Sequence, residues 1–140
     1  MWQDEGIVER LAEDDCWRLL RGKNLGRIAL AVGSEIDIFP VNYHCDGTSV
    51  LFRTAPGTKL LELTVNSRVA FEADGFDDMH AWSVVVKGTA EHLDSAADID
   101  EAERHPLTPW IPTLKYEFVR ISPASITGRR FERLPEPDRY

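Results

Sequence analysis

Large hydrophobic residues alternate with polar or small ones along much of the chain, and this period of two is typical of half-buried β-strands. The segment RIALAV (27–32) shows the pattern plainly, because Ile28, Leu30 and Val32 fall on one side of an extended chain. Comparable patterns predict strands in segments 36–45, 48–54, 68–74, 82–93, 116–122 and 125–131. The chain is therefore expected to contain six or seven strands.

Residues that favour turns separate several of these strands. Gly33-Ser34 and Asp46-Gly47 each indicate a tight hairpin turn, and an acidic loop is expected at Gly75–Met79. Pro40 lies inside a predicted strand and has no backbone N–H to donate, so we expect it at a sheet edge or a bulge. Connections this short favour antiparallel neighbours.

Three segments have helical rather than strand character. Residues 7–21 place apolar side chains loosely at helical intervals, as one broken helix or two short ones within an N-terminal helical segment of about 5–22. A second helix is expected after Pro56, with an apolar stripe that ends before Asn66. A third, polar helix is expected at 95–104, and the proline-rich segment 105–113 is expected to be a loop.

These elements predict a mainly β fold. Antiparallel strands that must hide their open edges favour a closed or nearly closed barrel with a few peripheral helices, and a two-layer sandwich is the competing architecture. The length of 140 residues fits a single domain, 1–140, with the barrel at about 25–131. The order of the strands cannot be deduced from these patterns.

Composition narrows the classes of partner. The 16 Lys and Arg residues are outnumbered by 24 Asp and Glu, giving a net charge of -8 and a pI near 4.9, so nucleic acid is not expected as a partner. No apolar run approaches the ~18 residues of a membrane span, and no signal-peptide pattern begins the chain, so we expect a cytoplasmic protein without a membrane partner. Cys16 and Cys45 are expected to be reduced thiols.

The segment Phe52–Lys59 has the composition of an anion-binding site. Arg53 closes a predicted strand, a Pro-Gly turn follows, and Lys59 opens a predicted helix, whose first N–H groups carry partial positive charge. The hydroxyls of Thr54 and Thr58 can donate, and the guanidinium offers a bidentate fork. This segment predicts a bound phosphate, and a solvated surface turn is the alternative.

Other chemical motifs are missing from the sequence. Neither a P-loop nor a GxGxxG pattern occurs, which disfavours nucleoside-triphosphate and Rossmann mechanisms. The four histidines lie on separate predicted elements without metal-ligand spacing, so no metal site is expected: His44, His80, His92 and His105. No nucleophile–base or paired-carboxylate arrangement is visible, and no catalytic residue is assigned.

Taken together in order and spacing, several segments resemble the pyridoxamine 5'-phosphate oxidase-like flavin-binding split barrels, in particular the short branch that includes nitroimidazole-resistance proteins. The resemblance extends from about Gly26 to Arg130 and rests on GRIALAV, PVNYHCDGTSVLFRTAPGTKLLEL, RVAFEAD, WSVVVKGTAEHL and PWIPTLKYEFVRISPASITGRR. It implies a six-stranded antiparallel split β-barrel of Greek-key type that forms a homodimer, with FMN bound at the subunit interface.

The resemblance also assigns residues to the cofactor. Arg53 and Lys59 would hold the FMN phosphate, with hydrogen bonds from Thr54 and Thr58. The remaining positions would lie along the ribityl chain and the isoalloxazine, partly through backbone groups: Pro40, Val41, Asn42, Tyr43, Trp82, Ser83, Val84 and Trp110. Arg27 is a weaker candidate, as an inward-facing arginine on the first barrel strand.

The function implied is that of an oxidoreductase acting on a small molecule, such as a nitroaromatic or similar electrophile, by hydride transfer at the flavin N5. Authentic pyridoxamine phosphate oxidation is not expected, because those oxidases are longer and their C-terminal substrate-binding pattern is not matched by GRRFERLPEPDRY. The alternatives are a deazaflavin- or haem-binding split barrel and a non-catalytic flavin-binding module.

Overall fold

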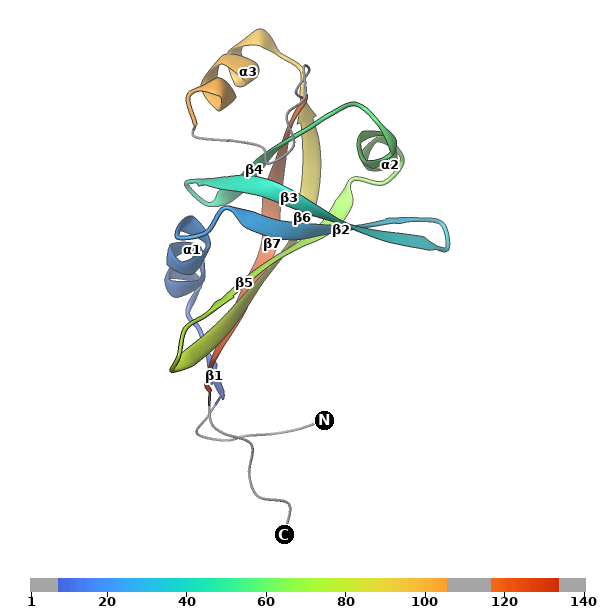
Figure 1. Cartoon of the computed structure of the whole chain (residues 1–140). Helices are drawn as coiled ribbons and strands as arrows, with labels where there is room; N and C mark the ends of the chain where they lie inside the picture. Colours follow the sequence, from blue (N-terminus) through green and yellow to red (C-terminus); the bar gives the residue numbers. More distant parts are fainter. Residues whose placement is uncertain (1–7, 106–116, 134–140) are drawn as a thin grey trace.

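The structure, a computed structural model that describes residues 8–105 and 117–133, is built around one antiparallel sheet that curls into a barrel (Figure 1). In chain order its elements are β1 (Val8–Arg10), α1 (Glu13–Arg21), β2 (Leu25–Val32), β3 (Glu35–Asp46), β4 (Ser49–Thr54), α2 (Thr58–Val65), β5 (Arg68–Phe76), β6 (His80–Leu93), α3 (Ala96–Glu103) and β7 (Glu117–Glu132). None of the helices in these ranges is long and apolar enough to cross a membrane.

The strand order closes the sheet on itself. The sequence of neighbours is β1-β7-β4-β3-β2-β5-β6, and β6 also pairs with β7. Strands β2 to β7 therefore form a complete ring, to which β1 is added as a short extra strand beside β7. The predicted six-stranded antiparallel barrel is confirmed, and the sandwich alternative is excluded, because closure removes the open edges.

The C-terminal strand differs from the prediction. The two strands expected at 116–122 and 125–131 are one strand, β7, which continues past Pro123. A register shift between Lys87 and Gly88 of β6 absorbs one extra residue of β7 at this point. Gly88 permits the close approach of the two strands, because a Cβ there would lie 2.1 Å from the carbonyl oxygen of Ser122.

The N-terminal helical segment of about 5–22 was predicted wrongly in its first half. Within its described residues the helix α1 begins only at Glu13, and Val8–Arg10 forms β1, paired with Arg129–Phe131 of β7. The apolar spacing did not reveal this, because pairing with a distant strand satisfies these backbone groups as well as a helix would. The end of α1 was predicted correctly, at Gly22.

The predicted turns, the position of Pro40 and the acidic loop can be compared with the structure. Gly33 and Gly47 have positive φ angles of 59° and 64° in the two hairpin turns, as tight turns require. Pro40 pairs only with β2, because the β3–β4 pairing begins at Tyr43, so its edge position is confirmed. The acidic loop is shorter than Gly75–Met79, since β5 extends through Phe76.

The barrel interior is filled by alternate residues of the strands. Ile28, Phe71 and Val84 are completely buried, and the rings of Tyr43 and Phe71 meet edge to face with centroids 4.8 Å apart. A second, smaller cluster lies under α3 on the outside of the barrel and consists of Leu51, Leu93, Ala102 and Phe118. The outer face of the strands is thus left to other side chains, except where α3 covers it.

Cys16 and Cys45 are both free and buried, which confirms the prediction of reduced thiols. Burial raises the pKa of the Cys45 thiol to about 12, so this residue is protonated at neutral pH.

Candidate functional site

The predicted anion site lies where β4 ends and α2 begins. Arg53 is half-buried next to the last residue of β4, and its guanidinium carbon lies 5.2 Å from the centroid of the Phe118 ring. Phe118 is the residue paired with Arg53 across the β4–β7 ladder. The aromatic ring therefore keeps this cation against the outer face of the sheet, beside the turn that leads to α2.

The N-terminus of α2 is suited to an anion. Its N-cap is Gly57, which has no side chain to accept a hydrogen bond from the first-turn N–H groups, and the first turn contains no acidic residue. The space beside Gly57 is open, since a Cβ there would meet no atom within 4 Å. Thr58 and Lys59 form the start of this helix, but their side chains lie outside the described part of the structure.

Strand alternation divides the other predicted cofactor residues between two faces. Four of them lie on the outer face: Pro40, Asn42, Arg53 and Ser83. The other five lie on the inner face or at the end of the barrel: Val41, Tyr43, Thr54, Trp82 and Val84. Only the outer set can present side chains to a ligand outside the barrel. The buried residues of the inner set can contribute there only through backbone groups.

Tyr43 and Thr54 illustrate the inner set. The Tyr43 hydroxyl donates a 2.7 Å hydrogen bond to the carbonyl oxygen of Leu20 at the end of α1, and burial raises the pKa of this phenol. The buried Thr54 hydroxyl donates to the carbonyl oxygen of Ala55 at 3.3 Å. Both hydroxyls thus have partners within the chain and stabilise the fold where they stand.

Trp82 contributes to packing at the end of the barrel. It pairs with Gly75 across the β5–β6 ladder, and a Cβ on Gly75 would lie 2.7 Å from the indole nitrogen. The indole therefore packs directly over the glycine backbone and against the main core. Trp110, the last of the predicted contacts, lies outside the described residues.

Arg27 was predicted to face inward, and this prediction is wrong. The neighbouring Ile28 occupies the inner position, so strand alternation places Arg27 on the outer face. Its Nε donates to Glu72 Oε1 at 2.8 Å, and its Nη2 lies 3.0 Å from Asp74 Oδ1. The hydrogen bond that Arg27 donates to the Glu72 carboxylate is the main reason that the pKa of Arg27 is raised.

This ion-pair group lies between the two predicted cofactor strands. Arg27 is in register with Pro40 on one side and with Glu72 on the other, and Asp74 is in register with Ser83. The sequence reasoning missed Glu72 and Asp74. Their alternation with buried residues in RVAFEAD, which places both on the outer side, is the signal that could have found them.

A cavity of about 330 Å³ opens on the same outer face, but none of the predicted cofactor residues lines it. Its lining includes three alanines, Ala29, Ala31 and Ala70, and two cations, Arg68 and Lys87. The cavity and the predicted flavin residues are therefore adjacent regions of one surface. The predicted residues combine a cation, a helix N-terminus and open backbone, and they form the candidate site.

Comparisons with known proteins agree with this fold. A family model described as pyridoxamine 5'-phosphate oxidase matches residues 12–130. The uncharacterized protein Rv3129 of Mycobacterium tuberculosis is 50% identical over 93 residues, which are 66% of this chain and 84% of that protein.

Two solved structures extend the likeness to nearly the whole chain. One, from Corynebacterium glutamicum and named for pyridoxamine 5'-phosphate oxidase, is 45% identical with a TM-score of 0.85, over 90% of this chain and 99% of that one. The other is an FAD-binding protein from Mycobacterium smegmatis, 43% identical with a TM-score of 0.77, over 89% of this chain and 98% of that one. With its barrel, its matched residues and these relatives, the chain belongs to the pyridoxamine 5'-phosphate oxidase family.

Proposed function

We propose that this protein binds FMN as a homodimer and acts as an oxidoreductase on a small molecule. The observation that carries the proposal is the arrangement at the β4–α2 junction, where the half-buried Arg53 lies close to a helix N-terminus that has no capping side chain. A terminal phosphate is the group that such an arrangement recognises best.

Each part of the junction has its own task in holding the phosphate. Arg53 would supply two parallel N–H donors from a guanidinium that lies over the Phe118 ring. The first turn of α2 supplies backbone N–H groups, which the open space beside Gly57 allows a ligand to approach. Lys59 adds a positive charge and Thr58 a hydroxyl from the same turn.

The outer face beyond the phosphate would receive the rest of the cofactor. Pro40, Asn42 and Ser83 lie on this face, and the Asn42 amide donates to the carbonyl oxygen of Asn24 at 3.2 Å, which fixes it in place. The bound flavin would supply hydride transfer at its N5. The chain's own residues bind and orient the ring and exclude water from it.

A second copy of the chain would cover this face. Ile36 and Ile38 are 72% and 66% exposed, and they lie on the part of the β2–β3 hairpin that extends beyond the barrel (Figure 1). Together with Ala29 and Ala31, which pair with them across the hairpin, they form an apolar surface that favours protein contact. The homodimer with FMN at its interface accounts for both the surface and the half-open site.

Three other cofactors are alternatives to FMN. The 43% identical protein from Mycobacterium smegmatis binds FAD, which makes FAD the competing flavin. A deazaflavin or haem in the same fold is the further alternative.

The test is a titration of the dialysed protein with FMN, FAD, a deazaflavin coenzyme and haem, followed by flavin fluorescence or absorbance. We expect FMN to bind most tightly, and sedimentation of the complex to give a dimer. Tighter FAD, deazaflavin or haem binding would correct the cofactor, whereas no binding would overturn the proposal. Turnover with a nicotinamide donor and a nitroaromatic acceptor separates an enzyme from a non-catalytic flavin-binding module.

A further inference from the structure

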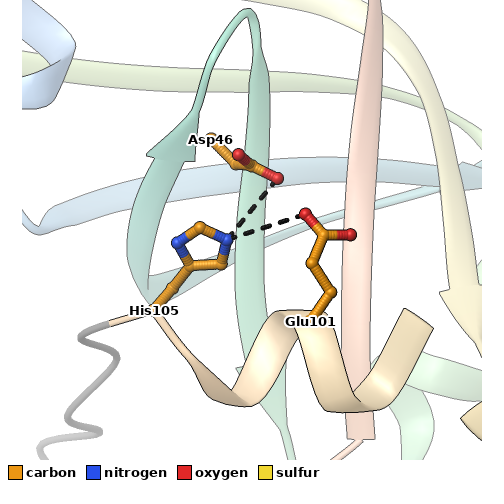
Figure 2. A group of neighbouring side chains, drawn as sticks. All are labelled: Asp46, Glu101 and His105. Atoms are coloured by element: carbon orange, nitrogen blue, oxygen red, sulfur yellow. Dashed lines mark ion pairs between the residues drawn. The ribbon is translucent and has the colours of Figure 1, made fainter. Parts of the chain in front are cut away.

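A second cluster of polar side chains lies at the C-terminal end of β3 and includes none of the predicted flavin residues. Asp46 is the last residue of β3, Glu101 belongs to α3, and His105 follows that helix (Figure 2). Figure 2 shows the imidazole and the two carboxylates turned toward one another. Asp46 is far from the other two residues in the chain, and the fold brings it beside them.

The end of α3 places two of the three side chains, Glu101 and His105, next to each other. The chain remains helical through Arg104, and the backbone N–H of His105 donates to the carbonyl oxygen of Ala102 at 3.1 Å. Glu101 and His105 are therefore one turn apart on the same side of the chain. The small cluster of Ala102, Leu51 and Phe118 holds this side against the sheet.

The distances are those of a ligand set that needs little rearrangement. His105 Nε2 lies 3.6 Å from Asp46 Oδ2 and 3.9 Å from Glu101 Oε1. Ligand atoms at about 2.0–2.2 Å from a tetrahedral Zn²⁺ lie roughly 3.3–3.6 Å from one another. The first separation already falls in that range, and the second would need to shorten by about 0.3 Å. The three ligand atoms all lie within 4.8 Å of one another.

The ring nitrogen of His105 gives an independent indication. His105 Nε2 is buried and makes no hydrogen bond to any described residue. Its separations from both carboxylates are too long for hydrogen bonds, and a buried ring nitrogen without a partner is costly. The ring of His44 stacks on one face of the imidazole, with centroids 4.7 Å apart.

Arg120 is the one cation in contact with these carboxylates among the described residues. Its Nη2 lies 2.9 Å from Asp46 Oδ2 and 3.9 Å from Glu101 Oε2. A carboxylate oxygen has lone pairs for both a guanidinium and a metal ion, and outer hydrogen bonds of this kind commonly orient ligating carboxylates. With a neutral imidazole, the group keeps a net charge of about -1, which still favours a cation.

We propose that Asp46, Glu101 and His105 form a binding site for a divalent transition-metal cation, with Zn²⁺ as the representative ion. One imidazole and two carboxylates suit Zn²⁺ and its neighbours in the first transition row better than Ca²⁺ or Mg²⁺. Three protein ligands leave a coordination position for water. The bound ion would tie the end of α3 to the β3–β4 hairpin, just before the chain enters 106–116.

The test uses the full chain after chelator treatment and dialysis. Zn²⁺ is titrated in competition with a chromophoric chelator, and Co²⁺ is added to a second sample to record its visible absorption. We expect one ion per chain and at least a tenfold weaker affinity in His105→Gln and Asp46→Asn. Thermal unfolding without metal checks that each variant folds, and Glu101→Gln, on the more exposed helix, replaces either one that does not.

A matched control separates this site from general metal adsorption. His92 Nε2 lies 2.8 Å from Glu117 Oε2 in an exposed pair, so His92→Gln removes an imidazole beside a single carboxylate. We expect His92→Gln to bind Zn²⁺ like the unmodified protein, and Zn²⁺ to slow proteolysis within α3 except in His105→Gln. Equal losses in His92→Gln and His105→Gln, or no Zn²⁺ binding by the unmodified protein, would overturn the proposal.

Discussion

The inner and outer faces of the same strands differ in how strongly packing constrains their side chains, although their residues alternate along the chain. Tyr43 and Phe52 pair across β3 and β4 and are buried in the core. Asn42 and Arg53, one residue away on each strand, lie on the outer face. Inner residues are constrained by packing, because the barrel leaves little free volume. Outer residues are released from that constraint and can serve a ligand or a second copy.

The largest effect that this comparison predicts is on an inner residue. Phe71→Ala removes a fully buried ring that contacts Tyr43, so we expect the free energy of unfolding to fall by about 3–5 kcal/mol. Urea unfolding measures this loss. Ala70→Ser, on the outer side of the same strand, should change the free energy by less than about 0.5 kcal/mol. Similar losses in both variants would remove the distinction between the faces.

Arg53→Ala, on the outer face, should reduce cofactor affinity much more than stability. Losing a charge-assisted contact of about 1.5–3 kcal/mol should weaken FMN binding roughly ten- to hundredfold, with little change in unfolding. Flavin fluorescence titration measures the affinity. Arg104→Ala, which removes an exposed arginine at the end of α3, is the control and should bind FMN normally. Equal weakening in both variants would mean that general charge, rather than a site, attracts the cofactor.

Tyr43→Phe tests whether an inner residue of the predicted cofactor set has any ligand role through its side chain. The change removes the 2.7 Å hydrogen bond to Leu20, so we expect a loss of about 1 kcal/mol in the free energy of unfolding. FMN affinity should stay within about twofold. A tenfold drop in affinity with unchanged stability would show that the hydroxyl faces the ligand instead.

Glu62→Gln examines the boundary between the faces, where β3 leaves the barrel and meets α2. The hydrogen bond with Asp37 raises the pKa of Glu62 above its usual value of 4.5. The folded state therefore holds this proton more tightly than the unfolded chain, and stability falls as the pH rises from 4.5 through the raised pKa. The variant should lose this pH dependence and unfold at a slightly higher temperature at pH 7. If Glu62→Gln and the unmodified protein had the same melting temperatures from pH 4 to 8, the hydrogen bond between Glu62 and Asp37 would be contradicted.

Part of the candidate site was predictable because it is local in sequence. Arg53, Gly57 and Lys59 are separated by only a few residues, and a strand end, a turn and a helix start suffice to bring them together. The side-chain faces were harder to predict. Arg27 faces outward because its strand is fixed in register with both β3 and β5, and Glu72 and Asp74 reach it only through the β2–β5 pairing.

By itself, the sequence determined most of the barrel strands, the turns at Gly33 and Gly47, and the candidate anion site between β4 and α2, because each depends on periodicity or on the conformations of neighbouring residues. The tertiary structure alone decided that β6 pairs with β7 to close the barrel, that Val8–Arg10 is a strand, and that Asp46 meets His105. These features join residues far apart in the chain. Their energies depend on which backbone groups and charges the completed fold brings into contact, and no local pattern records that.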